Sequence, residues 1–479
     1  MKKRAVILGA GISGLAAGYV LSKKGFETLV LEKGANTGGL AATFEHKSYF
    51  LDFGPHNFHT RFPGVLDFVK NELHVSLQRI PVSSSKLFFM GKFIEYPFKI
   101  NTFMRNLSFA VSLRCIFEYL ACRIKRRLFP RKQVDSFEVW VKSHFGSYLY
   151  NLYFGPYVRK VWGILGSRLD AVVARKRIPE PSLFSFLARS VSRKKVFRGH
   201  SEDPSAIESY YPPGGIGVIA ENLKEGIASR NGKVLTRCQV ASIALPQQRS
   251  GEGSVCYRID GIKQEAPFDL LISTIPLTTL GELSWYRDER VLADETSRLS
   301  YRSIILLYLF LDMERLFEDP WIYFNERGSP ALIFNRLYEI GNFSRQMTHH
   351  NKTCVCLEIT CCEGDAVWNT PDESLFESCM AYLEKNNLLK KSQVREILVK
   401  RLEVAYPVFE IGYRSHVRKA LESCFAFGNI LPLGRQGLFS YSNIDHCIDM
   451  GLKLEKLFAS GDLEVRPNVF FELYNNYLC

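Results

Sequence analysis

The chain has 479 residues, 46% of them hydrophobic, and a formal net charge of +13 at pH 7. That length predicts two or three domains with an ample core, and because no run of about 18 uncharged apolar residues occurs, we expect no membrane-spanning helix. The 12 cysteines are scattered without metal-ligand spacing, so we expect no metal site and no disulfide framework, but reduced thiols in a cytoplasmic protein.

The amino-terminal segment predicts a strand, a turn, a helix and a second strand. Ala5 to Leu8 is a short apolar run, Ile12 to Lys23 has helical character with small residues on one face, and Phe26 to Leu31 is again apolar. Basic residues before an apolar run are also typical of a secretory signal peptide. Glycines interrupt this run, however, and we therefore interpret it as part of the fold.

The glycines have the spacing G-x-G-x-x-G, which in a strand-turn-helix unit is typical of dinucleotide binding. Gly9 permits the tight turn, Gly11 lets main-chain amides approach a pyrophosphate at the helix N-terminus, and Gly14 allows close packing of helix and strand. Glu32, at the end of the second strand, can accept hydrogen bonds from ribose hydroxyls. The predicted cofactor-binding residues of this unit are Gly9, Gly11, Ile12, Ser13, Gly14, Glu32 and Lys33.

A second glycine pair distinguishes between two kinds of dinucleotide. Gly38 and Gly39, followed by Leu40, come shortly after the second strand, where they allow the chain to pass close to a phosphate or a ribityl group. An NAD-dependent dehydrogenase does not need this loop, so the pattern favours FAD. A short strand over 50–54 then leads to a turn that contains His56.

The segment 105–132 holds eight Lys or Arg residues and one Glu, with apolar residues between them at roughly helical spacing. We favour a helix packed on its own domain with a solvated basic face. The alternative is a peripheral helix at a membrane surface rich in anionic lipid. Nucleic acid is not an expected partner, because no recognised binding module accompanies the charge.

The later half of the chain predicts strands with alternating and continuous apolar character, among them 303–312 and 354–360. Arg336 is flanked by apolar residues on another predicted strand. A buried arginine needs an anion, which is either a substrate carboxylate or phosphate or an internal carboxylate such as Glu339 or Glu358.

Several of these segments resemble the FAD-binding parts of the amine oxidase superfamily, which includes protoporphyrinogen oxidases, phytoene desaturases and UDP-galactopyranose mutases. The resemblance rests on Glu32 with the sequence GGLAAT at 38–43, on 232–235 with Val240, on FDLLISTIP at 268–276, and on 427–458. It implies that Val240 meets the adenine and that the helix near the C-terminus faces the flavin. The further cofactor residues that it implies are Gly38, Gly39, Leu40, Val240, Thr274, Gly434, Arg435, Asn443 and Ile444.

Other segments resemble UDP-galactopyranose mutases in particular: 54–60, 91–103, 153–163, 334–343, and Arg435 with Tyr441. The resemblance implies site roles for His56 at the flavin, Trp162 in the substrate cleft, Arg336 on an anion, and Tyr406 and Tyr441 on the substrate. Two positions depart from the mutase pattern. Pro181 stands where those enzymes carry a second essential arginine, and Asn443 stands in place of an aspartate.

Together these features predict an α/β fold with a discontinuous Rossmann-type FAD-binding domain (1–75, 205–285 and 420–460), a helical insertion (76–204), a substrate domain with an antiparallel sheet (286–419) and a tail (461–479). The resemblance implies an FAD-dependent oxidoreductase in which hydride passes from a small-molecule substrate to flavin N5. The alternative is a non-redox mutase that uses reduced FAD on a nucleotide sugar. The oligomeric state is left open.

Overall fold

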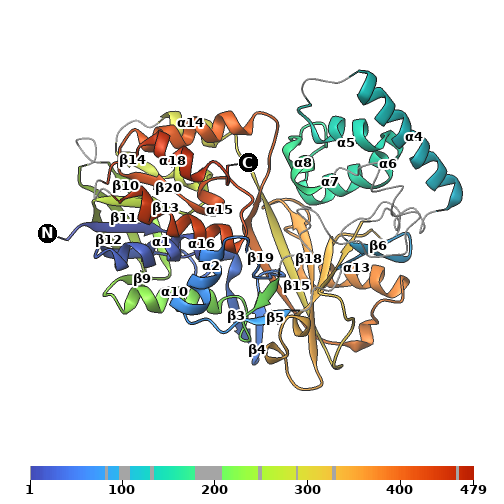
Figure 1. Cartoon of the computed structure of the whole chain (residues 1–479). Helices are drawn as coiled ribbons and strands as arrows, with labels where there is room; N and C mark the ends of the chain where they lie inside the picture. Colours follow the sequence, from blue (N-terminus) through green and yellow to red (C-terminus); the bar gives the residue numbers. More distant parts are fainter. Residues whose placement is uncertain are drawn as a thin grey trace.

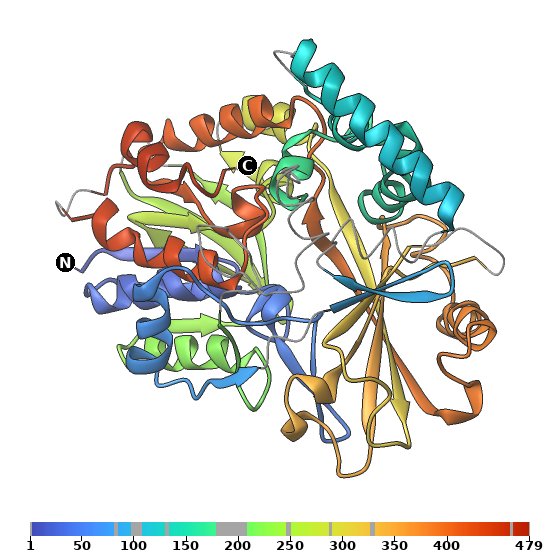
Figure 2. The same ribbon diagram turned by 45° about the vertical axis from the view of Figure 1, so that its right-hand side comes forward.

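The protein is described by a computed structural model over residues 2–80, 85–96, 108–129, 134–178, 208–245, 251–286, 290–325, 331–459 and 463–478. Figure 1 shows a parallel sheet layered with helices in one half of the molecule and a large, mostly antiparallel sheet in the other. A group of helices from the first half of the chain lies at the end of the large sheet (Figure 2).

The first sheet has five parallel strands in the order β20-β13-β1-β2-β9. Its strands come from distant parts of the chain: β1 (Arg4–Leu8), β2 (Glu27–Leu31), β9 (Lys233–Leu235), β13 (Leu270–Ser273) and β20 (Ile430–Pro432). Ala5 pairs with Thr28 on one side and with Leu270 on the other. The central strands β1 and β13 are apolar because both faces of such a sheet are covered.

Helices from three regions pack on this sheet. The helix α1 (Ile12–Lys23) lies between α10 (Val218–Ala228) and α16 (Ile444–Leu452) and is buried along nearly its whole length. Gly18 allows the close approach, because a Cβ atom there would lie 2.9 Å from the Ile227 side chain. The expected α/β fold class is therefore confirmed, with the amino-terminal turn at the carboxyl end of the sheet.

The second sheet has seven strands in the order β19-β15-β18-β17-β16-β6-β7. Its bounds are β6 (Ser85–Phe89), β7 (Lys92–Tyr96), β15 (Tyr301–Leu311), β16 (Trp321–Phe324), β17 (Arg336–Glu339), β18 (Thr353–Cys361) and β19 (Val394–Pro407). The helix α13 (Asp372–Lys385) covers one face, over a separate apolar cluster. The hairpin β6-β7 lies in the range 76–204, which we expected to be helical. It forms strands there because β16 of the later sheet completes the hydrogen bonds along the edge of β6.

Apart from β5 (Gln78–Ile80), the other elements described in that range are helices: α4 (Phe109–Leu128), α5 (Phe137–Phe145), α6 (Ser147–Leu149), a π-helix (Tyr150–Phe154), α7 (Gly155–Trp162) and α8 (Val172–Arg177). Pro181 falls outside the described residues. Among the helices that are described, none combines the length and the apolar character that crossing a bilayer requires.

Shorter elements complete the fold. A small sheet holds β10 (Cys238–Ala244), β11 (Gly253–Ile259), β12 (Ile262–Phe268) and β14 (Ser284–Tyr286); further strands are β3 (Thr43–His46), β4 (Tyr49–Asp52), β5 (Gln78–Ile80) and β8 (Ser209–Tyr211). Further helices are α2 (Pro63–Asp67), α11 (Leu277–Glu282), α12 (Arg290–Thr296), α14 (Tyr413–Phe425), α15 (Gly434–Gly437), α17 (Leu454–Leu457) and α18 (Pro467–Tyr474).

Candidate functional site

The glycine-rich turn between β1 and α1 forms an open cradle. Gly9 has φ of +94°, in the left-handed region that favours glycine. A Cβ atom on Gly14 would lie 2.0 Å from the Gly9 carbonyl oxygen, so helix and turn touch there. At Gly11, the N-cap of α1, a Cβ atom would meet nothing within 4 Å. The turn is therefore closed on its inner side and open where an anion would face the helix N-terminus.

The second glycine pair lies against this cradle. Gly38 donates its amide hydrogen to the Ala10 carbonyl at 2.8 Å, and a Cβ atom on Gly39 would come within 3.3 Å of the Gly11 Cα atom. Gly38 and Gly39 both have positive φ. The chain thus passes over the first turn, with Leu40 following directly.

The carboxylate of Glu32 joins the two loops. One oxygen accepts from the Ala10 amide at 2.8 Å, and the other accepts from the Gly34 amide at 2.7 Å. Each oxygen retains a lone pair for a ribose hydroxyl. Lys33 points elsewhere, to an exposed ion pair with Glu403 at 3.1 Å, so the structure offers no support for its expected cofactor role.

Two predicted residues from later parts of the chain, Gly434 and Thr274, pack directly on the turn. Gly434 has φ of +83°, and a Cβ atom there would lie 2.6 Å from the Cβ atom of Ser13. The Thr274 hydroxyl donates to the Leu8 carbonyl at 2.9 Å. A segment more than 400 residues away in the sequence therefore closes the same turn.

Three other predicted residues lie around this turn in different roles. Asn443 caps α16, where its side chain accepts from the third backbone amide and His446 Nδ1 accepts from the Asn443 amide at 3.2 Å. Ile444, the first residue of that helix, is buried. Val240 lies on β10, which begins beside Glu32: the Cys238 amide donates to the Glu32 carbonyl at 2.8 Å.

These residues fit an extended dinucleotide. The cradle at Gly11 is open, Gly39 and Gly434 leave no side chain between the loops, and Glu32 is placed for a ribose. Among the described residues, the buried Ser273 Oγ and Arg435 Nε find no hydrogen-bond partner. A bound group that offers phosphate or carbonyl oxygens would satisfy such donors.

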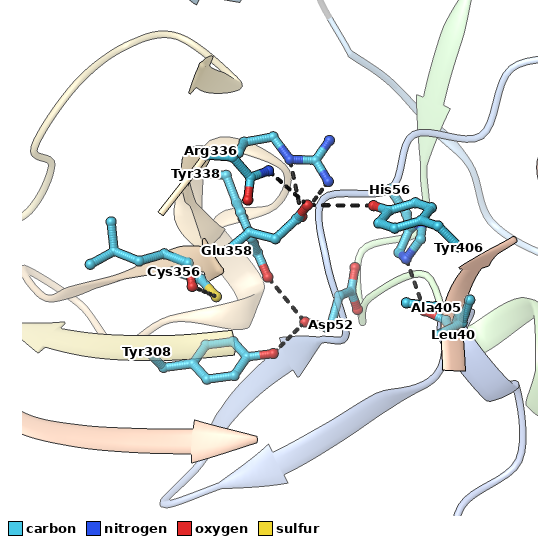
Figure 3. A network of polar contacts seen from close by, with 12 residues as sticks. Leu40, Asp52, His56, Tyr308, Arg336, Tyr338, Cys356, Glu358, Ala405 and Tyr406 are labelled. Atoms are coloured by element: carbon cyan, nitrogen blue, oxygen red, sulfur yellow. Dashed lines mark hydrogen bonds and ion pairs between the residues drawn. The ribbon is translucent and has the colours of Figure 1, made fainter. Parts of the chain in front are cut away.

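A second group of polar residues lies on strands of the large sheet, with His56 and Leu40 beside it (Figure 3). Arg336 on β17 and Glu358 on β18 are directly paired in register, and Arg336 Nε donates to Glu358 Oε2 at 3.1 Å. A second, shorter contact runs from Arg336 Nη2 to the same oxygen. Glu358 therefore is the anion that a buried Arg336 needs, whereas Glu339 accepts from the amides of residues 316 and 317.

The two predicted tyrosines stack beside this ion pair. The rings of Tyr406 and Tyr441 are 5.8 Å apart and 11° from parallel, and the Tyr406 hydroxyl donates to Glu358 Oε1 at 3.4 Å. The guanidinium of Arg435 lies 4.5 Å from the Tyr441 ring and 5.1 Å from the Tyr406 ring. Cation–π attraction of this kind is strongest where water is excluded.

Arg177 at the end of α8 completes the cluster. Its guanidinium lies 4.1 Å from the Tyr441 ring and 5.4 Å from the Trp162 ring. Burial alone would raise the pKa of Tyr441, but Arg177, Arg435 and Arg336 outweigh burial and lower the pKa to about 8. The lowered pKa of the phenol thus indicates a strongly positive local potential.

His56 connects the two groups. Its Nε2–H donates to the Leu40 carbonyl at 2.8 Å, which fixes the ring beside the second glycine loop. Burial, with a further contribution from Arg336, lowers the pKa of His56 to about 4. The imidazole is therefore neutral at physiological pH and suits a hydrogen-bonding and shaping role better than proton transfer.

The structure brings together His56, Trp162, Arg336, Tyr406, Arg435 and Tyr441, and it adds two residues that sequence reasoning did not place in the site. No role was predicted for Arg177, which is the last residue of α8. Glu358 was one of two alternatives, and only the register of β17 and β18 selects it.

The profile of the flavin containing amine oxidoreductase family matches residues 12–413. The chain therefore belongs to this family, and FAD is its cofactor. The site is thus that of a flavin enzyme, and within the family several branches share its architecture.

Relatives of known structure show the same fold at low identity. A reduced UDP-galactopyranose mutase superposes with a TM-score of 0.81 and 21% identity, over 97% of this chain and 95% of that chain. A protoporphyrinogen oxidase-like protein from Exiguobacterium sp. 255-15 has a TM-score of 0.71 and 16% identity, over 95% and 98%. Putrescine oxidase bound to putrescine has a TM-score of 0.61 and 15% identity, over 96% and 99%.

Sequence relatives match over a short segment. The L-amino-acid oxidase of Crotalus adamanteus is 38% identical over 68 residues, which cover 14% of this chain and 13% of that enzyme. A 1-hydroxycarotenoid 3,4-desaturase from Flavobacterium sp. (strain P99-3) is 42% identical over 72 residues, 15% of this chain and 14% of that enzyme. The matched segments thus span about one-seventh of these relatives.

Proposed function

We propose that this protein is an FAD-dependent oxidoreductase that acts on an anionic small molecule. The observation that carries the proposal is the positive cluster beside Tyr441. The negative charge of Glu358 balances the positive charge of Arg336. Arg435 donates hydrogen bonds only to neutral groups, the carbonyl oxygens of Ser442 and Ala405, and its Nε is buried without a hydrogen-bond partner. A substrate carboxylate or phosphate would balance this charge.

The chain's own residues supply binding and orientation. Arg177 and Arg435 attract the anion, and the stacked Tyr406 and Tyr441 rings lie beside them. His56, held on the Leu40 carbonyl, keeps the second glycine loop in place without carrying charge. When FAD is bound, it supplies the capacity to accept a hydride from the substrate.

A nucleotide-sugar mutase is the second candidate, and one observation favours it specifically. Arg177 stacks on Trp162 and Tyr441, so an arginine reaches the cluster although position 181 is proline. Two arginines from different elements would hold a diphosphate better than one. The fold that this chain shares with a UDP-galactopyranose mutase is consistent with that candidate.

Anaerobic spectroscopy tests the proposal. The purified holoprotein is mixed with a panel of amines, carboxylates, phosphates and nucleotide sugars, and the visible flavin absorbance is followed. We expect an anionic compound to bleach the oxidised flavin, and an added electron acceptor to restore the colour.

The same panel distinguishes the second candidate. A nucleotide sugar that leaves oxidised flavin unchanged, but is converted to an isomer after dithionite reduction, would replace the oxidoreductase with the mutase. If only neutral or cationic compounds bleach the flavin, and Arg435→Gln does not alter their affinity, the anionic-substrate proposal is wrong.

A further inference from the structure

The helix α4 (Phe109–Leu128) carries an apolar stripe on its outer side. Figure 2 shows this helix along the outer edge of the molecule, with the other helices of its group behind it. Six of its apolar side chains are 43–83% exposed. This outer stripe consists of Phe109, Leu113, Phe117, Leu120, Ile124 and Leu128.

The spacing of the outer stripe places its residues on one face. At 3.6 residues per turn, successive steps of four, four, three, four and four positions confine the six side chains to an arc of about 100°. The opposite face holds the helix on the protein, with Cys115 buried. The sequence favoured a packed helix that exposes only its basic side chains; the structure shows that its apolar side chains are exposed as well.

The charges of α4 are distributed in relation to this stripe. Arg114, Lys125 and Arg127 are exposed at its edges. Glu118, the one acid in the helix sequence, turns inward, where its carboxylate accepts from the Tyr148 amide at 2.7 Å. The outer side of the helix is consequently apolar in the middle and cationic at its margins.

We propose that the outer stripe of α4 docks this protein on a membrane surface that bears anionic lipids. An in-plane helix buries its apolar face at the boundary of headgroups and acyl chains, while Lys and Arg at its edges meet lipid phosphates. A second copy of the chain fits less well. Pairing the stripe with itself would bring the cations of both copies together, on a protein whose net charge is already +13.

Vesicle co-sedimentation of the full-length holoprotein tests this proposal. The probes are vesicles of phosphatidylcholine alone and vesicles that also contain phosphatidylglycerol. We expect binding to the anionic vesicles only, and weaker binding at high salt, because salt screens the lysine and arginine charges.

Two variants separate the apolar and the electrostatic contributions. Phe109→Ser/Phe117→Ser/Ile124→Ser should lower the partition coefficient by at least about tenfold. Arg114→Gln/Lys125→Gln/Arg127→Gln should lower it by about 100-fold at low salt, since each charge contributes strongly near an anionic surface. Both variants should keep the flavin spectrum and the melting temperature of the wild type, and the charge variant remains a test if the apolar variant does not fold.

Matched controls change the same kinds of residue elsewhere. Ile262→Ser/Val291→Ser/Val469→Ser removes exposed apolar side chains from the half with the parallel sheet, and Lys233→Gln/Arg258→Gln/Lys263→Gln removes three exposed charges there. Both should bind vesicles as the wild type does. The proposal is overturned if the wild type binds neither vesicle, if the controls lose binding equally, or if the stripe variant only converts a dimer to a monomer.

Discussion

Arg336 and Glu358 form a largely buried ion pair in this site. Their side chains are 16% and 3% exposed, respectively, and they lie side by side on neighbouring strands. Desolvation makes such a pair a weak source of stability, but removal of one partner leaves a buried charge uncompensated. Glu358 also accepts from Tyr406, so the ion pair positions one wall of the site.

We predict that Arg336→Met destabilises the protein by about 3–5 kcal/mol, because Glu358 would remain buried without its cation. The double variant Arg336→Met/Glu358→Gln should recover most of that loss. Denaturant unfolding measures both values. As a control, Arg395→Gln removes an arginine from an exposed pair with Asp312 and should change stability by about 0–1 kcal/mol; an equally small effect at Arg336 would show that the buried pair does not act as described.

The protonation of Tyr441 makes the charge of the site depend on pH. Its pKa of about 8 lies below the ordinary value of 10.0, since three guanidinium groups outweigh burial. Deprotonation is therefore favoured in the folded state. Its contribution to stability is fully present above the ordinary pKa and is lost as the pH falls through about 8.

We predict that the affinity for an anionic ligand falls about tenfold per pH unit above pH 8, because a tyrosinate competes for the same cations. In Tyr441→Phe this dependence should disappear, with binding retained at pH 7. Ligand titrations monitored by the flavin spectrum measure the affinity, and the ultraviolet absorbance of the phenolate follows the titration. A pH dependence that persists unchanged in the phenylalanine variant would assign it to another group.

At the scale of elements, the turn before α1 is tightly packed at Gly14 and open at Gly11. Gly14 is needed for packing, because the Gly9 carbonyl lies where a side chain would begin, whereas Gly11 faces open space. The two glycines of one motif thus serve different purposes. One lets the helix approach the strand, and the other leaves room for a pyrophosphate.

We predict that Gly11→Ala folds with an unchanged melting temperature as apoprotein but is purified with much less flavin, since the methyl group projects into the space for the phosphates. Gly14→Ala should also lose stability, by at least about 1–3 kcal/mol, through steric overlap. Flavin content per chain and unfolding of the apoproteins distinguish the two effects. Gly64→Ala, in α2 with open space around it, is the control and should retain both flavin and stability.

At the scale of the whole molecule, Asp52 joins parts of the chain that are far apart in sequence. Its carbonyl accepts from the Tyr308 hydroxyl at 2.7 Å and from Tyr338 at 3.3 Å, on two strands of the large sheet. Its carboxylate accepts from Thr43 at 2.6 Å and from Tyr211. Burial raises the pKa of Asp52 to about 6, and these contacts connect the large sheet to the half with the parallel sheet.

We predict that FAD stabilises the entire chain, because the residues placed to hold it come from both ends of the sequence. With free FAD at 100 times its Kd, the gain should be about 2.7 kcal/mol relative to the apoprotein. Thermal unfolding followed by tryptophan fluorescence, with and without added FAD, measures the gain. Riboflavin, which lacks the pyrophosphate and the adenine, is the control and should leave the midpoint near that of the apoprotein; an equal effect of both compounds would mean that the glycine turns are not used.

The sequence by itself determined the strand-turn-helix unit, the second glycine pair and the α/β class. These features are local: glycine spacing and apolar runs act within about 30 residues, where chain geometry leaves few alternatives. It also indicated Arg336, Tyr406 and Tyr441 as site residues, but not how they meet.

Only the tertiary structure decided the rest. The choice of Glu358 over Glu339 depends on the register between β17 and β18, the arrival of Arg177 at Tyr441 depends on how α8 is placed, and the edge position of β6 and β7 depends on a partner strand more than 200 residues later. Long-range pairing and charge balance are set by packing between distant segments, and no local pattern encodes them.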